Sequence, residues 1–172
     1  MERGARVAQR VFECNAEEMK RETLLSYVVG LGLGCCVMAA AQDKGNWRAV
    51  SSTAKSITGD VGLTDEKVAI NFSNFTIARI RGLQGAEASA LFDADNSGGG
   101  GIGNVYRLSI PATKVFLHKN TLCGTEETQW MVSYAAGRSL QLAFFSGAKP
   151  PVLTLEALTN SSETCGTFSY VR

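Results

Sequence analysis

The chain has 172 residues, and its 17 Lys/Arg nearly balance its 16 Asp/Glu, which gives a formal net charge of +1 at pH 7. No basic stripe interrupts this balance, so a nucleic-acid partner is not expected, because phosphate binding needs clustered positive charge. The same balance argues against a membrane-surface role driven by charge.

The first predicted element is a secretory signal at residues 19–41. It opens with Met19-Lys20-Arg21, continues through an uncharged run and ends with Ala39-Ala40-Ala41. A basic start, an apolar middle and a small-residue cleavage site are the parts of a signal peptide. Cleavage after Ala41 would export the domain that begins at Gln42. An uncleaved anchor would export the same domain and would then be its only membrane contact, so the predicted location is periplasmic or secreted.

Residues 1–18 precede this signal and mix arginines with glutamates. No export signal needs such a prefix, so we interpret it as an extension ahead of a translation start at Met19. A short cytoplasmic helix ahead of an anchor is the alternative. Cys35 and Cys36 raise a lipoprotein hypothesis, but the apolar segment continues past both of them.

Residues 42–172 have the length of a single domain. They contain only two cysteines, Cys123 and Cys165, each followed by a glycine. A cysteine pair in an oxidising compartment favours a disulfide, and closing a loop of this length is worth up to about 4 kcal/mol. A metal site is the alternative, but two thiols and one distant histidine make a poor ligand set.

Short runs of alternating or apolar residues, separated by turn residues, indicate an all-β domain. We predict a small antiparallel β-barrel, lipocalin-like or similar, with a β-sandwich as the alternative. A hairpin turn is expected at Ser73-Asn74, and the register that it sets places Val68, Ile70, Phe72, Phe75 and Ile77 on one inward face. A long loop that could carry a short strand near Ala90-Leu91-Phe92 is expected over 84–103, and an edge strand or short helix over 152–158. The predicted strands are 47–57, 67–72, 75–83, 104–110, 128–136, 139–146 and 166–171.

The clearest predicted hairpin joins 128–136 to 139–146 through Gly137-Arg138, a turn that starts with glycine. Both of its faces are apolar, whereas antiparallel strands usually keep one polar face. We favour burial of both faces over a ligand cavity on one of them. The candidate surface for a ligand or partner comprises Trp130, Tyr134, Phe145, Ser146 and Gly147.

No catalytic or cofactor-binding constellation is found, so we predict a protein that is not an enzyme and needs no cofactor. Asp93, Asp95 and Ser97 match the start of a calcium loop, but Asn104 stands where a bidentate glutamate is needed. This leaves only a weak metal candidate. His118 is the only histidine in the chain and is expected in a loop or at a strand end.

Three stretches together resemble a group of small exported proteobacterial proteins of unassigned function: SITGD at 56–60, NTLCG at 120–124 and CGTFSY at 165–170. The resemblance implies a periplasmic or secreted location and a Cys123–Cys165 link, and it implies no activity. The Ser-Gly-Ala sequence at 146–148 is similar to a loop of the periplasmic lysozyme inhibitors, which are small disulfide-bearing β-barrels. In that family an aromatic residue follows where this chain has Lys149 and Pro150.

These observations predict a non-enzymatic exported β-domain of the bacterial envelope that binds a small ligand or an envelope protein. An inhibitor of a secreted hydrolase, either a lysozyme or a protease, is the alternative.

Overall fold

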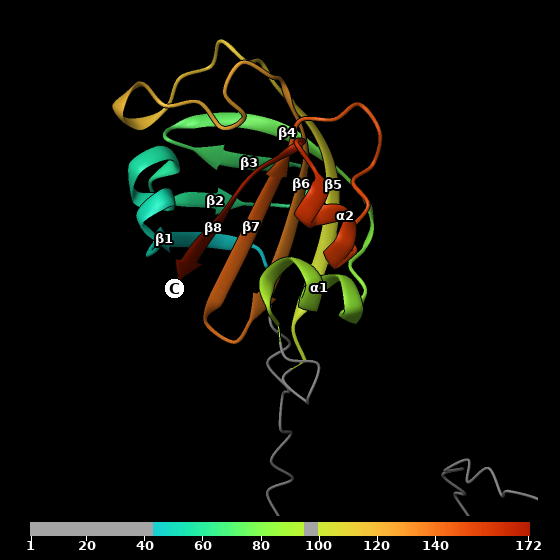
Figure 1. The fold of residues 1–172 in the computed structure, drawn as a ribbon. Coiled ribbons are helices and arrows are strands. Elements are labelled where there is room, and N and C mark those ends of the chain that lie inside the picture. The colour runs from blue at the N-terminus through green and yellow to red at the C-terminus, as the bar shows by residue number, and fades with distance from the viewer. Residues whose placement is uncertain (1–42, 95–99) are drawn as a thin grey trace, which may run out of the picture. The chain divides into compact units, whose positions relative to one another are not determined.

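The computed structural model describes residues 43–94 and 100–172, in which eight antiparallel strands form a closed barrel (Figure 1). Each strand pairs with the next along the chain, and the last pairs with the first. The predicted barrel is confirmed and the sandwich alternative is excluded. The predicted signal at 19–41 and the extension at 1–18 lie outside the described residues. The strands are β1 (Gly45–Ala49), β2 (Val61–Leu63), β3 (Lys67–Ile70), β4 (Ser73–Gly82), β5 (Ile102–Ile110), β6 (Thr128–Ala136), β7 (Ser139–Phe145) and β8 (Thr164–Val171).

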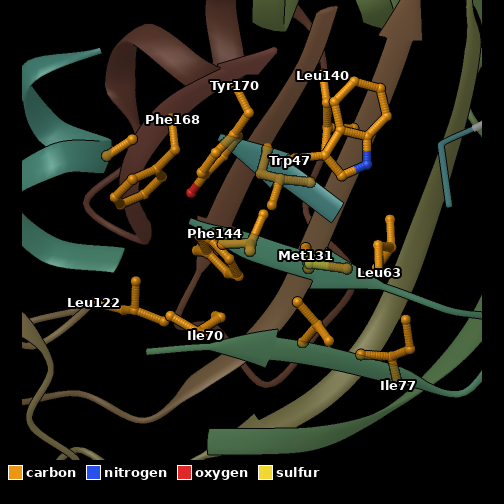
Figure 2. Close-up of a cluster of buried hydrophobic side chains, with 14 of the residues drawn as sticks. Trp47, Leu63, Ile70, Ile77, Leu122, Met131, Leu140, Phe144, Phe168 and Tyr170 are labelled. Atoms are coloured by element: carbon orange, nitrogen blue, oxygen red, sulfur yellow. The ribbon is translucent and has the colours of Figure 1, made fainter. Parts of the chain in front are cut away.

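The interior of the barrel is filled with apolar side chains (Figure 2). Alternate residues of each strand point inward, and those that meet at the centre are large. Each such side chain, once fully buried, is worth roughly 1.5–3 kcal/mol. The most deeply buried large residues include Trp47, Met131, Phe144, Phe168 and Tyr170. The interior is therefore a packed core.

The barrel closes where β1 meets β8, through the pairs Arg48–Val171 and Ala49–Tyr170. This seam is short, and a side-chain contact adds to it. The guanidinium of Arg172 lies 3.9 Å from the ring centre of Trp47, a cation–π contact of the kind that stabilises by about 0.5–2 kcal/mol.

The β6–β7 hairpin forms as predicted, with Ala136 opposite Ser139 and the turn at Gly137-Arg138. Gly137 has a φ of 57°, which glycine adopts without steric cost. The inward face carries Met131 and Phe144, and the outward face carries apolar residues as well.

Two helices cover this outward face, α1 (Gly85–Phe92) and α2 (Leu155–Asn160). They contact each other and lie outside β5, β6 and β7 in Figure 1. Together with the strands they enclose a second apolar cluster, so the hairpin is buried on both faces, as favoured from its sequence. The buried members of this outer cluster are Phe92, Val105, Trp130, Val132, Ala143, Phe145 and Leu153.

Helix α1 occupies part of the segment that was expected to be a loop, and the short strand expected near Ala90-Leu91-Phe92 is wrong. A capping box starts the helix: the backbone N–H of Gln84 donates to Glu87 at 2.9 Å, and the Gln84 side chain accepts from the first turn. Arg81 forms an ion pair with the same glutamate at 2.7 Å, which lowers the pKa of Glu87. These local bonds, together with the burial of Ala88 and Phe92, favour a helix over an extended chain.

The predicted first strand is too long, because β1 ends at Ala49 and a π-helical segment, η1 (Ala54–Thr58), follows. The Ser51 hydroxyl accepts from the backbone N–H of Ala54 at 3.1 Å. Serine side chains that bond to nearby backbone groups compete with strand pairing in this way. Thr58 then anchors the segment to the core through a 2.8 Å hydrogen bond with the Tyr170 hydroxyl.

The β3–β4 turn lies at Asn71-Phe72, two residues before the predicted position, and Ile70 faces Ser73. The predicted inward face survives for Val68, Ile70, Phe75 and Ile77, because the change in register is even. Phe72 is the exception, since it lies in the turn and is fully exposed.

Strand β2 was not predicted, because its three residues are too few to show a period. The boundaries of the other strands differ by about two residues from expectation, as is usual for element ends. Strand β5 begins at Ile102 and β8 at Thr164. Segment 152–158 adopts the helical alternative, as α2. Within the part of the chain that the structure describes, neither helix has the length and apolar character that crossing a bilayer requires.

Candidate functional site

The most site-like region at the candidate surface is a pocket of about 590 Å³ between the β7–α2 loop and α2. Phe145 forms part of its wall at the end of β7, and Pro150 and Pro151 form another part. Leu158 of α2 and Glu163 complete the side nearest the C-terminus. The volume lies in the roughly 300–1,000 Å³ range of small-molecule sites.

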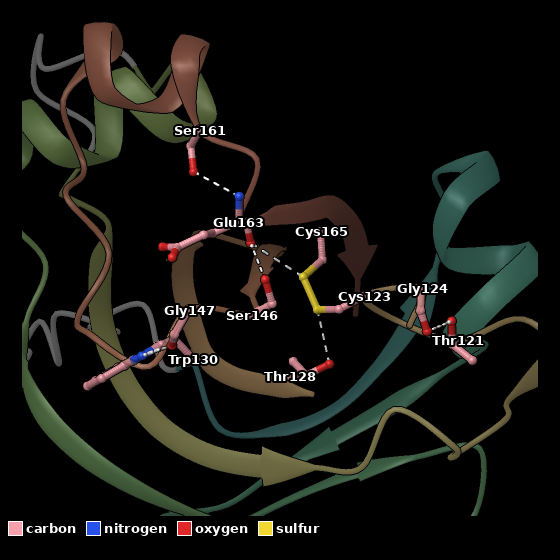
Figure 3. Close-up of a disulfide and its surroundings, with 10 residues drawn as sticks. All are labelled: Thr121, Cys123, Gly124, Thr128, Trp130, Ser146, Gly147, Ser161, Glu163 and Cys165. Atoms are coloured by element: carbon pink, nitrogen blue, oxygen red, sulfur yellow. Dashed lines mark hydrogen bonds between the residues drawn. A yellow bond between two sulfur atoms is a disulfide. The ribbon is translucent and has the colours of Figure 1, made fainter. Parts of the chain in front are cut away.

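The loop at 146–151 is tied to the barrel at its start (Figure 3). The backbone N–H of Ser146 donates to the carbonyl of Glu163 at 2.9 Å. The indole N–H of Trp130 donates to the carbonyl of Gly147, also at 2.9 Å. The Glu163 carboxylate packs so closely on Gly147 that a Cβ there would overlap it. The first half of the loop is thus held in place, while Ala148-Lys149-Pro150 is exposed.

A disulfide joins Cys123 to Cys165 beside this loop, with the Cα atoms 4.7 Å apart (Figure 3). It links the β5–β6 connection to the start of β8. The carbonyl of Glu163, which accepts from Ser146, lies two residues before Cys165. The covalent bond therefore fixes the segment on which the loop rests.

The five residues of the candidate surface occupy two depths. Trp130 and Phe145 are buried in the outer cluster. Tyr134 is half-buried, stacked on Phe92 with the ring centres 6.1 Å apart. Only Ser146 and Gly147, both partly exposed, belong to the loop. The aromatic residues therefore pack beneath the loop and contribute little exposed surface of their own.

Exposed apolar side chains adjoin the pocket. Val152 is 66% exposed and Leu155 is 69% exposed. Lys149 and Glu163 add one charge of each sign to the pocket lining. An apolar surface with polar groups at its edge is the composition of a protein-recognition patch.

A buried polar network around Asp43, inside the barrel, was not predicted from the sequence. The Asp43 side chain accepts hydrogen bonds from Asn104 at 2.8 Å, Tyr106 at 3.0 Å and Ser133 at 3.2 Å. Arg79 donates in turn to Asn104 at 2.6 Å. Burial, together with the nearby Asp43, raises the pKa of the Tyr106 hydroxyl. The sequence did contain an indication of this network, because Asn104 and Ser133 are polar residues at inward positions of their strands.

The weak metal candidate is only partly described. Asp93 ends α1 in a left-handed conformation, with a φ of 51°, whereas Asp95 and Ser97 lie outside the described residues. Asn104 is committed to the Asp43 network. His118 is exposed within a single 3-10 turn, Leu117–Lys119. Among the described residues, no group of three or more His, Cys, Asp or Glu side chains is placed to hold a metal ion.

Comparisons with family models, with curated proteins and with solved structures give no match. The resemblance to exported proteobacterial proteins therefore stays a prediction. Function has to be argued from the surface of the barrel.

Proposed function

We propose that this chain is an exported, non-enzymatic β-barrel of the bacterial envelope that recognises a partner with its outer surface. The main support for this proposal is that the interior of the barrel is filled with side chains. Met131, Leu142 and Phe144 are fully buried at its centre, where a carrier would need an open cavity. Recognition then falls to the loops and the helical side of the barrel.

The surface around the β7–α2 loop is the best candidate for this recognition. It combines a pocket of about 590 Å³ with two neighbouring exposed apolar residues, Val152 and Leu155. Exposed apolar groups of this kind mark interaction sites. The disulfide and the Trp130 hydrogen bond hold the first half of the loop in place, which lowers the entropy lost on binding.

Crosslinking in intact cells tests this function. A photoreactive residue placed at Leu155 of the full-length protein is expected to capture one envelope component. The same residue at Ile80, which is 53% exposed on β4, serves as the control. Leu155→Glu should abolish capture from a photoreactive residue at Val152. Equal capture at Leu155 and Ile80, or none at either, would contradict the proposal.

Inhibition of a secreted hydrolase is a second candidate, favoured by the form of the loop. Ser146 and Gly147 are held, and Ala148-Lys149-Pro150 is exposed. A held, projecting loop suits insertion into an enzyme cleft, because little order is lost on binding. A panel of lysozymes and secreted proteases, titrated with protein to about 10 μM, tests it, since tight inhibitors act far below that concentration. Absence of inhibition across the panel would remove this candidate.

A further inference from the structure

A second cleft, of about 530 Å³, opens on the outer face of β1, β2 and β3 and shares no lining residue with the pocket at α2. Gly62 and Ala69 face each other across β2 and β3. Because neither carries a side chain beyond a methyl group, they form a low floor. Leu117 contributes an apolar wall, and Phe72 lies at the exposed edge of the cleft. The result is a hollow on the outside of a closed barrel.

Backbone strain is concentrated at this cleft. Five non-glycine residues in the described part of the chain have φ in the left-handed region, and four of them form two adjacent pairs in turns beside the cleft. One pair is Asn71-Phe72 in the β3–β4 turn, and the other is His118-Lys119, directly after Leu117. A left-handed φ is unfavourable for residues other than glycine, asparagine and aspartate, so Phe72, His118 and Lys119 carry the strain. Strained turns of this kind cluster at binding sites.

Phe72 combines the strain with complete exposure. Its φ is 62° and its side chain is fully accessible, so it gives up backbone energy without gaining burial. Glycine would adopt this conformation freely. The aromatic ring therefore contributes little to folding. A binding role, in which the ring offers a flat apolar face to a ligand, explains why phenylalanine stands at this position.

Polar groups of the cleft are open to a ligand. The structure gives no hydrogen-bond partner to the side-chain amides of Asn46 and Asn71 within the residues it describes. Each amide supplies both donors and an acceptor. Asp60 uses one carboxylate oxygen to accept from the backbone N–H of Ala49 at 2.9 Å, and its other oxygen has no hydrogen bond within that same part of the chain.

This combination selects among ligand classes. Among the residues that the structure describes, Asp60 is the one charged residue in the cleft lining, which disfavours an anionic ligand. The strands beneath are paired on both sides, so an extended peptide cannot add as a strand. A pyranose sugar offers an apolar CH face for an aromatic ring and hydroxyl groups that both donate and accept. We propose that the cleft binds a short neutral glycan, stacked on Phe72 and hydrogen-bonded by Asn46, Asn71 and Asp60.

Titration of the full-chain protein with neutral trisaccharides, followed by amide NMR, tests the site. The probes are the trimers of N-acetylglucosamine, glucose, galactose and mannose. At least one should shift the resonances of the β2, β3 and 71–72 region in a saturable manner, at concentrations up to about 10 mM, the range of weak specific binding. Asn46→Ala should weaken that binding by about tenfold, the effect of losing hydrogen bonds worth about 1.4 kcal/mol.

The Phe72→Gly variant separates binding from folding. It should raise the unfolding temperature, because strain is relieved, and abolish glycan binding. Ile80→Ala, which removes an exposed apolar group from β4 outside the cleft, should leave binding unchanged. Failure of all four trisaccharides to bind would overturn the proposal. So would binding that Phe72→Gly leaves intact, or a preference of the same residues for sulfate or an acidic peptide.

Discussion

The Asp43 network allows a sharp test of the barrel's construction. Asp43→Ala removes the acceptor shared by Asn104, Tyr106 and Ser133, at distances of 2.8, 3.0 and 3.2 Å. Asp43 is only 5% exposed, and a buried donor left without a partner costs roughly 1–3 kcal/mol. With three donors affected, and because the costs of neighbouring groups are not fully additive, we expect a loss of about 3–5 kcal/mol. That is a large share of the roughly 5–15 kcal/mol by which a domain is stable.

Urea unfolding, followed by tryptophan fluorescence, measures this loss as a lower midpoint at an unchanged slope. All three donors bond to the same Asp43 oxygen. Asp43→Asn can keep an acceptor oxygen there but removes the charge, so it should lose about half as much. Asp65→Ala is the matched control, because Asp65 pairs with Lys44 on the surface and is 77% exposed. It should change stability by about 0.5 kcal/mol or less. A loss below about 1 kcal/mol for Asp43→Ala would contradict this expectation, since the three donors would then be satisfied elsewhere.

Three further predictions concern the disulfide, the outer cluster and the stability of the domain at alkaline pH. Cys165→Ser should lower the free energy of unfolding by about 4 kcal/mol, because the disulfide joins residues 42 positions apart and so restricts the unfolded chain. Equal urea midpoints for the oxidised and reduced wild type would contradict this. Phe145→Ala, at a site only 2% exposed, should lose roughly 3–5 kcal/mol although it faces outward; a loss below about 1 kcal/mol would mean that the helices do not cover it. Burial raises the pKa of the Tyr106 and Tyr170 hydroxyls above the value of about 10 that tyrosine has in the unfolded chain. Stability should therefore stay constant at pH values below about 10 and fall as the pH rises above it. Flat stability from pH 9 to 12 would argue against that burial.

The hairpin of β6 and β7 was predictable because two independent signals agreed. Gly137 fixed the turn, and the alternation of the flanking residues then assigned both faces. The apolar character of the outward face also indicated a covering layer, and α1 and α2 supply it. The identity of that layer could not be predicted, because its contacts join segments far apart in the sequence.

Helix α1 was missed for a local reason. It has eight residues, too few for a clear 3.6-residue period, and its decisive feature is the bond between Gln84 and Glu87. That capping box was visible in the sequence, but it does not lead into a long apolar run. The β3–β4 turn was misplaced because Phe72 was assigned to the core by its type. Its exposure follows from the turn geometry, which no hydrophobicity pattern contains.

The candidate site was predicted only in part. The sequence placed Ser146 and Gly147 at the end of a strand, and the structure adds that Trp130 and Glu163 hold them from below.

The Asp43 network depends on the closed barrel, which brings this residue, just before β1, to Asn104 of β5 and Ser133 of β6. The cleft at Phe72 depends on Leu117, far along the chain, lying beside β2 and β3. Such long-range placements are set by tertiary packing.

Quenching by a brominated fatty acid tests most directly whether recognition uses the surface or the interior. The chain has two tryptophans, so Trp130→Phe leaves Trp47, which is 1% exposed in the packed interior, as the sole reporter. Because the interior is filled, we expect no saturable quenching of Trp47 as the fatty acid is added. Saturable quenching with one-to-one stoichiometry would contradict it, because a ligand would then occupy the interior and the protein would be a carrier.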